Sequence, residues 1–222
     1  MSGGWEDSNS GQWSALDTNT RYGPEVGLVI VDVQNDFADP AGSLYVNGGS
    51  EVVPLVNAEV AQALKAGAVV VYTQDWHPAH TPHFAADGGI WPVHCVAETW
   101  GAQLQPQLEV RGPIVRKGTR GEDGYSGFSM RNPDGGDAVP TELDSILSQY
   151  GAKRIVVCGL ATDYCVRATA LDGVRLGYDT AVLLGLVRAV DVQPGDGERA
   201  LAELAGAGVA LVGDETPALP AR

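Results

Sequence analysis

The chain alternates between short apolar runs rich in Val and Ile and longer segments in which apolar residues recur at helical spacing. Because the runs are apolar at consecutive positions, they are typical of strands buried on both faces of a parallel sheet. We predict six such strands, at residues 26–33, 68–73, 114–116, 155–158, 180–184 and 209–212. Helices are predicted between them, with Ser50 as the N-cap of the first and Gly67 and Gly151 as stops.

Strands that alternate with helices indicate an α/β protein with right-handed crossovers. We therefore expect a three-layer, doubly wound fold: a six-stranded, mainly parallel sheet with helices on both faces. Residues 26–213 form this single domain, and residues 214–222 form a polar C-terminal tail. Residues 1–25 are rich in Gly, Ser, Asn, Asp and Thr, which predicts an irregular arm. Its Trp5 and Trp13 could dock on the domain or on a neighbouring subunit, or the arm could be disordered.

The charge of the chain narrows the classes of partner. The formal net charge is −14, so nucleic acid and anionic membranes are poor partners. No apolar run reaches the roughly 20 residues that span a bilayer, and no signal peptide is evident. The expected compartment is therefore the cytoplasm, with a small molecule as partner and homo-oligomerisation left open. Three widely spaced cysteines argue against a disulfide framework and leave room for one reactive thiol.

Four chemically capable side chains fall at or just after the ends of the first four strands: Asp32, Asp75, Lys117 and Cys165. In open α/β sheets ligands bind outside the carboxyl ends of the strands, so these residues should gather at one edge. Cys165 also begins a helix, where the positive end of the dipole favours thiolate. Taken singly, each has a plain alternative: a solvated strand end, a surface lysine or a small buried hydrophobe.

The three side chains together could form a nucleophile (Cys165), its base (Asp32) and a positive charge that influences the ionisation of both (Lys117). Asp32 would take the proton from Cys165, while Lys117 would hold the carboxylate and stabilise the ionised pair. The turn at residues 160–165 would offer backbone N–H groups to the oxyanion of a tetrahedral intermediate.

All four histidines lie within residues 77–94, following Asp75. One carboxylate and three imidazoles suit zinc, iron or manganese. We therefore predict a site for one divalent metal ion, zinc in the first place, with Asp75, His77, His83 and His94 as the candidate ligands. His80 is expected at the surface. Such a site would leave coordination positions open for water or substrate, although each histidine taken alone could be structural.

Six segments, in order along residues 26–212, closely resemble the nicotinamidase branch of the isochorismatase-like cysteine hydrolases. They are IVDVQNDF (30–37), DWHP (75–78), WPVHCV (91–96), RKG (116–118), YSGF (125–128) and GLATDYCVR (159–167). The resemblance implies a doubly wound six-stranded sheet and hydrolysis of nicotinamide to nicotinate and ammonia through a thioester, a step of NAD salvage. Pyrazinamide is a further expected substrate.

Residue by residue, the resemblance implies that Asp32 is the general base and later the acid, that Lys117 completes the triad, and that Cys165 carries the acyl group. The N–H groups of Ala161 and Cys165 would form the oxyanion hole, preceded by a non-proline cis peptide at 160–161. The metal would sit on Asp75, His77 and His94, with His83 as a fourth ligand in some members, and would hold the pyridine nitrogen. The pocket walls would be Phe37, Trp91, Tyr125 and Leu160, although Phe37 could be an ordinary core aromatic.

Three alternatives remain open from the sequence. The chain could be another amidase of this family that acts on a related small or aromatic carboxamide. It could be a metallohydrolase in which metal-bound water attacks and the cysteine is incidental. It could also be an inactive module that binds nicotinamide. The long loop at 118–137, rich in Gly and Asp, leaves the substrate range open.

Overall fold

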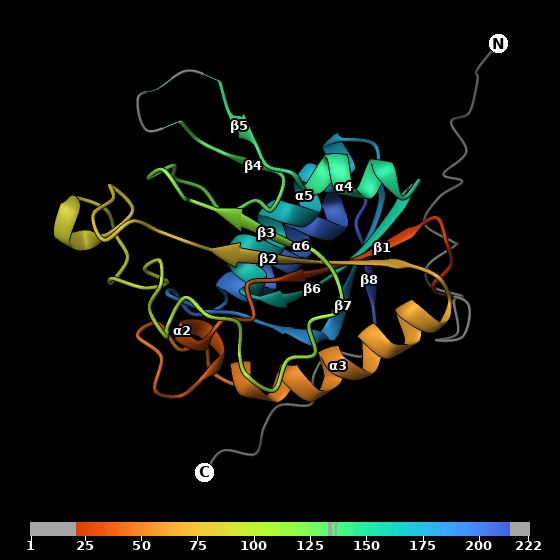
Figure 1. Ribbon diagram of the computed structural model, residues 1–222, viewed down its shortest axis with the longest axis horizontal. Coiled ribbons are helices and arrows are strands. Elements are labelled where there is room, and N and C mark those ends of the chain that lie inside the picture. Colours follow the sequence, from red (N-terminus) through yellow and green to blue (C-terminus); the bar gives the residue numbers. More distant parts are fainter. Residues whose placement is uncertain (1–20, 133–134, 136, 214–222) are drawn as a thin grey trace.

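The computed structural model describes residues 21–132, 135 and 137–213 (Figure 1). The arm residues Trp5 and Trp13 and the tail at 214–222 lie outside these ranges. Within them the main sheet has six strands, all parallel, in the order β3-β2-β1-β6-β7-β8. The predicted fold class is therefore confirmed. The strands are β1 (Val26–Val31), β2 (Val69–Asp75), β3 (Ile114–Lys117), β6 (Arg154–Leu160), β7 (Asp179–Arg188) and β8 (Ala210–Val212).

Helices cover both faces of the sheet, with α3 on one side and α4, α5 and α6 on the other (Figure 1). The alternation of side chains along β1 explains both layers. Leu28 and Ile30 belong to the core cluster that contains the inward residues of α3. Val29 and Val31 belong to the opposite cluster, with the inward residues of α4, α5 and α6. The helices are α2 (Asn35–Ala38), α3 (Gly49–Lys65), α4 (Leu143–Gln149), α5 (Arg167–Arg175) and α6 (Asp196–Gly206).

The six strands and four longer helices match the predicted elements, with differences at several ends. Ser50 is not the N-cap of α3, because the helix begins at Gly49 and Gly48, at φ 74°, precedes it. Strand β7 runs four residues past its predicted end. The sequence also did not indicate α2 or the hairpin of β4 (Ser129–Met130) and β5 (Val139–Pro140). Gly67, at φ 83°, ends α3 as expected.

The segment before β1 is tied to the domain in its described part. Arg21 and Tyr22 are buried, and both side chains donate hydrogen bonds to Glu59 of α3, at 2.5 and 2.8 Å. This part of the arm holds neither helix nor strand. Among the described residues, no helix combines the length and apolar character needed to cross a bilayer.

Candidate active site and metal centre

The strand order reverses between β1 and β6, so the carboxyl ends of these strands meet at the switch point where α/β sheets bind ligands. Asp32 follows β1 directly, and Cys165 lies in a π-helical turn, η2 (Thr162–Val166), which follows β6. Register pairs Asp75, the last residue of β2, with Lys117, the last residue of β3. The structure thus brings all four side chains to one edge.

Lys117 lies at the centre of this group. Its Nζ is 2.8 Å from Asp32 Oδ2 and 3.6 Å from Cys165 Sγ, and it also donates to Asp75 Oδ1. One carboxylate oxygen of Asp32, one of Asp75 and the sulfur of Cys165 all lie within 4.8 Å of one another. Thr73 Oγ1 donates to Asp32 Oδ1 at 2.7 Å and so fixes the second oxygen of that carboxylate. An acid, an amine and a thiol therefore meet as the sequence predicts.

Burial and neighbouring charges set the protonation of this group. Burial raises the pKa of Asp32, and Lys117 only partly opposes it. Burial would also raise the pKa of Asp75, but Lys117 and the nearby imidazoles outweigh it and lower that pKa to about 2. Burial disfavours the charged form of Lys117, yet the two carboxylates outweigh it and hold its pKa well above the usual value. Lys117 is therefore an ammonium.

The surroundings of Cys165 act against the thiolate that the helix N-terminus alone would favour. Burial raises the pKa of the thiol well above its usual value; Lys117 lowers it, while Asp32 and Asp75 raise it further. These effects outweigh the helix N-terminus on which the sequence argument relied. Asp32, whose pKa burial also raises, lies beside this thiol.

The turn that carries Cys165 has an unusual backbone. The peptide bond between Leu160 and Ala161 is cis, as the family resemblance implies. The carbonyl of Ala161 accepts hydrogen bonds from the N–H groups of Tyr164 and Val166, at 3.2 and 3.0 Å. Cys165 therefore lies in the first turn, where N–H groups of a helix are available to other acceptors.

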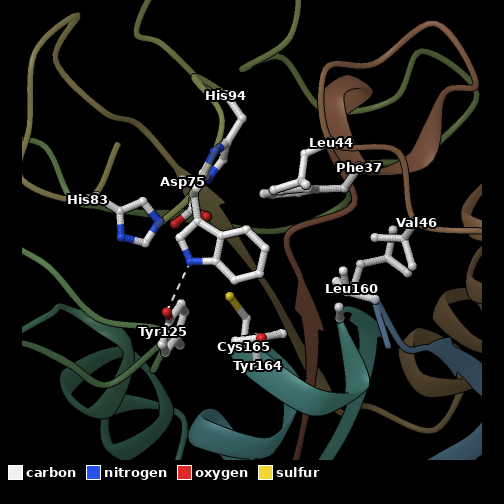
Figure 2. Close-up of a pocket in the computed structure, with 13 residues that line it drawn as sticks. Phe37, Leu44, Val46, Asp75, His83, His94, Tyr125, Leu160, Tyr164 and Cys165 are labelled. Atoms are coloured by element: carbon white, nitrogen blue, oxygen red, sulfur yellow. Dashed lines mark hydrogen bonds between the residues drawn. The ribbon is translucent and has the colours of Figure 1, made fainter. Parts of the chain in front are cut away.

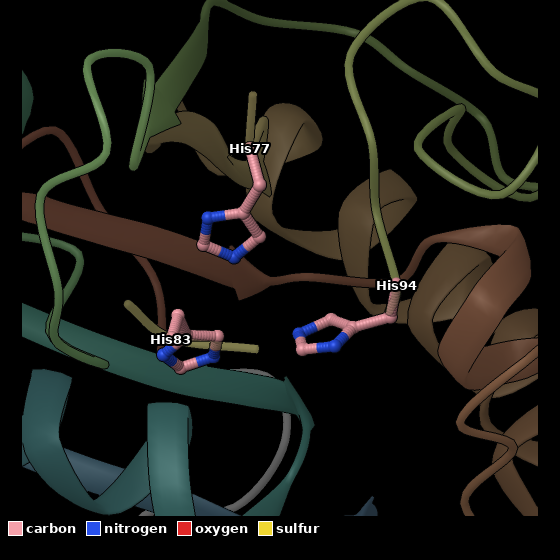
Figure 3. Close-up of side chains that lie close together, drawn as sticks. All are labelled: His77, His83 and His94. Carbon is pink, nitrogen blue, oxygen red and sulfur yellow. The ribbon is translucent and has the colours of Figure 1, made fainter. Parts of the chain in front are cut away.

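Three buried histidines form a second group beside this one. Figure 3 shows His77, His83 and His94 turned toward one another. Their ring centroids are 4.9 to 5.4 Å apart, and one nitrogen from each lies within 4.8 Å of the others. His80 is 87% exposed at its side chain and lies outside the cluster, as expected.

The chemistry of these histidines fits a divalent metal ion. His94 Nδ1 is 2.7 Å from the Pro92 carbonyl and His83 Nδ1 is 2.8 Å from an Asp123 carboxylate oxygen. Since both partners only accept, Nδ1 donates in each case and Nε2 keeps a free lone pair. Both ring nitrogens of buried His77 lack a hydrogen-bond partner in the described part of the chain. A metal bond to one of them would give that nitrogen a partner.

Neutral imidazoles are what a metal site needs. Burial lowers the pKa of His77 to about 4, and burial likewise lowers the pKa of His94. Asp75 Oδ2 is 3.9 Å from His77 Nε2, while its Oδ1 accepts from Lys117. Asp75 is therefore placed between the two groups and could ligate a metal through Oδ2.

A small pocket opens onto both groups, and Figure 2 shows the sulfur of Cys165 pointing into it. The four residues expected as walls, Phe37, Trp91, Tyr125 and Leu160, all line it. Trp91 Nε1 donates to the Tyr125 hydroxyl at 3.0 Å. Four further residues line the pocket that were not expected from the sequence: Leu44, Val46, Tyr164 and Val190. Of these, only Tyr164 carried a signal, as an aromatic next to the expected nucleophile.

The segment after β1 holds the site together through side chains whose role the sequence did not show. Gln34 Nε2 donates to the Asp75 carbonyl at 2.7 Å, and Gln34 Oε1 accepts from the Asp75 N–H at 2.8 Å. Asp36 Oδ2 accepts from the Cys95 N–H at 2.7 Å, next to His94. Two candidate metal ligands are thereby fixed relative to Asp32.

Known proteins similar to this chain include a nicotinamidase and a pyrazinamidase. The nicotinamidase of Escherichia coli K12 is 36% identical over 207 residues, covering 85% of this chain and 94% of that protein. The pyrazinamidase of Pyrococcus horikoshii, solved in complex with zinc, shares 39% identity at a TM-score of 0.76, covering 85% and 99% of the two chains. PnC1 from L. infantum, solved with nicotinate, shares 37% identity at a TM-score of 0.76, covering 85% and 92%.

The isochorismatase domain family matches residues 26–214. This range contains β1 to β8, the Asp32–Lys117–Cys165 group and the histidine cluster. The chain therefore belongs to the isochorismatase family.

Proposed function

We propose that this protein is a metal-dependent cysteine amidohydrolase that converts nicotinamide to nicotinate and ammonia. The observation that carries the proposal is the position of Lys117 Nζ, 2.8 Å from Asp32 Oδ2 and 3.6 Å from Cys165 Sγ, beside three imidazoles. Cys165 and three of the candidate metal ligands, Asp75, His83 and His94, line one small pocket. The proposed base, Asp32, is buried beside Cys165.

The first half of the reaction forms a thioester. Asp32 removes the proton from Cys165, and Sγ attacks the amide carbon of the substrate. The negative charge that develops on the amide oxygen is bound by the N–H groups of Ala161 and Cys165. When the C–N bond breaks, Asp32 returns the proton to the nitrogen, ammonia leaves, and the acyl group stays on sulfur.

The second half releases the acid. Asp32, now a carboxylate again, removes a proton from water, whose oxygen attacks the thioester carbon. The C–S bond breaks, the sulfur takes the proton back, and nicotinate departs. The sum is nicotinamide plus water giving nicotinic acid plus ammonia, which leave in water as nicotinate and ammonium. Asp32 therefore acts as base and then acid in each half of the reaction. Lys117 stays charged throughout and stabilises each anionic state of its neighbours.

Asp75, His77, His83 and His94 would hold the metal, for which we propose zinc. When bound, the metal supplies a Lewis acid for the ring nitrogen and thereby a fixed ring orientation. Phe37, Trp91, Tyr125 and Leu160 would pack around the ring and exclude water. Nicotinamide is the proposed partner, pyrazinamide a second substrate, and the cytoplasm the proposed location, where this step would serve NAD salvage.

The test is an assay of ammonia release from nicotinamide, pyrazinamide and a carbamoyl amide, with and without a chelator. We expect nicotinamide and pyrazinamide to be preferred and the chelator to remove activity, which added zinc restores. Cys165→Ala should lose roughly 10⁴-fold or more in kcat, whereas Cys158→Ala, in the buried core, should retain turnover. A preference for the carbamoyl amide would favour another amidase, and an active Cys165→Ala enzyme would favour a metallohydrolase.

A further inference from the structure

His83 has a hydrogen-bonding partner that none of the motifs contains. Asp123, in the loop before β4, lies with Oδ1 2.8 Å from His83 Nδ1. The two residues are 40 positions apart in the chain, and the His83 side chain is buried. A residue from the Gly-rich loop therefore reaches the histidine cluster directly.

Asp123 is itself held from two sides by Arg131. The backbone N–H groups and carbonyls of the two residues exchange hydrogen bonds of 3.2 and 2.6 Å, which close the loop into a short antiparallel bridge. Arg131 Nη2 donates to Asp123 Oδ2 at 2.5 Å. With one oxygen on Arg131 and the other on His83, the carboxylate has a fixed orientation.

This arrangement determines which nitrogen of His83 faces the cluster. A carboxylate accepts only, so Nδ1 carries a proton, and in the neutral imidazole that binds a metal the lone pair is then on Nε2. A carboxylate partner also makes the imidazole a stronger ligand and fixes the plane of its ring. The neighbouring histidines differ: the His94 ring donates to a backbone carbonyl, and the ring nitrogens of His77 have no hydrogen-bond partner among the described residues.

The His80–Asp87 pair shows that His–Asp proximity alone does not make such a site. His80 Nδ1 is 3.3 Å from Asp87 Oδ1, but the His80 side chain is 87% exposed and lies outside the cluster. This second pair lies in the same loop as His83 and provides a matched control.

We propose that Asp123, held by Arg131, is a positioning residue of the metal centre that presents His83 Nε2 to the ion. The inference rests on the proposed function, since it requires that the histidine cluster binds a metal. The proposal adds that the loop before β4 contributes to metal affinity through Asp123, a residue outside the set of candidate ligands.

The experiment measures zinc affinity of the full chain by competition with a chromophoric chelator. Asp123→Asn keeps the size of the side chain but loses its charge, and we expect zinc binding to weaken about 10–100-fold. Arg131→Gln, on the exposed side of the pair, should weaken it in the same direction but less. Asp87→Asn should leave zinc affinity unchanged. The melting temperature of each zinc-free variant reports whether the fold is retained.

A double-mutant cycle with His83→Ala separates positioning from a general effect on the fold. If Asp123 acts through His83, Asp123→Asn should have no further effect on zinc affinity in the His83→Ala background. Additive losses would overturn the proposal, as would folded Asp123→Asn and Arg131→Gln chains that bind zinc within twofold of the wild type. A wild-type chain that binds no zinc would overturn the metal site itself. A wild-type chain that binds zinc with the same affinity as Asp123→Asn would overturn only the role of Asp123.

Discussion

Lys117 is the residue on which the balance of charge in the site depends. It is buried, and among the residues that the structure describes its ammonium is the one cation in contact with both Asp32 and Asp75. Two buried carboxylates without a partner would be costly, since each must be removed from water. Lys117 therefore stabilises the fold at the same place where it is proposed to support catalysis.

Lys117→Met removes this charge while keeping a long apolar chain. Breaking a buried pair in this way should lower the free energy of unfolding by about 3–5 kcal/mol, measured by urea titration in excess chelator. Lys153→Met removes an exposed ion pair with Glu25 and should change stability little. Equal stability of Lys117→Met and wild type would contradict the charge balance described for the site.

The pH dependence of the same variant has a defined sign. Burial raises the folded-state pKa of Asp32, and loss of Lys117 should raise it further. A carboxyl with a raised folded pKa contributes stability that is complete below its unfolded pKa and is lost as the pH rises through its folded pKa. The stability difference between Lys117→Met and wild type should therefore shrink as the pH falls from 8 toward 5. A difference that grows on acidification would contradict this.

At the scale of single residues, the sequence was enough to bring Asp32, Lys117 and Cys165 to one edge of the sheet, but not to show the direction of the Cys165 pKa shift. The positions of Asp32, Lys117 and Cys165 follow from strand ends, which apolar runs reveal. The pKa of Cys165 depends instead on how deeply the thiol is buried and on two carboxylates within 4.8 Å. Those distances belong to the folded chain, and so does the contact between His83 and Asp123.

Among the elements, the pairing of β1 with β6 fixes the site, because Asp32 and Cys165 follow these two strands. Gly159 lies opposite Val31 in this pairing, at φ 113°. A Cβ on Gly159 would lie 2.1 Å from the Val31 carbonyl oxygen and 2.7 Å from its nitrogen. Both contacts are with backbone, which cannot rotate away, so only glycine fits here.

Gly159→Ala should therefore separate the two strands beside Asp32. We expect a loss of more than about 3 kcal/mol in unfolding free energy, since backbone overlap adds to the usual cost of overpacking, together with a fall in kcat. Gly177→Ala has a similar positive φ of 91° but nothing within 4 Å of the added Cβ, and should cost about 1 kcal/mol. Similar losses for the two variants would show that backbone strain, not close approach, explains Gly159.

Elements with a strong local signal were predictable, and those built from distant contacts were not. The apolar runs of β1 and β6 can be recognised directly in the sequence. Strand β7 ends at Arg188, and a charged residue gives no strand signal in the sequence. The Arg188 guanidinium donates hydrogen bonds to the carbonyls of Gly185 and Val187. Strands β4 and β5 have two residues each, too few for a periodic pattern.

For the whole molecule, the parallel order of the sheet gathers donors from β2 and from the loop after it into one buried cluster. Three imidazoles and a carboxylate so close together offer several ligand atoms to one cation. A ligand that binds only the folded state stabilises it by mass action, about 2.7 kcal/mol at 100 times the Kd. The metal is therefore expected to contribute to stability as well as to the reaction.

Zinc at 100 times its Kd should raise the melting temperature by about 5–11 °C, measured by differential scanning calorimetry against the chelated protein. His94→Ala should abolish most of this shift, because it removes one ring from the cluster. His80→Ala, at the exposed neighbour, should keep the shift. A shift that persists in His94→Ala would place the metal elsewhere.

The central claim is that Cys165 carries the acyl group of the substrate, and intact-mass spectrometry of the enzyme quenched during turnover of nicotinamide tests it most directly. We predict a nicotinoyl adduct that hydroxylamine removes, that maps to the peptide containing Cys165, and that is missing in Cys165→Ala. Sustained turnover by Cys165→Ala, with no adduct on the wild-type enzyme at any quench time, would contradict the account.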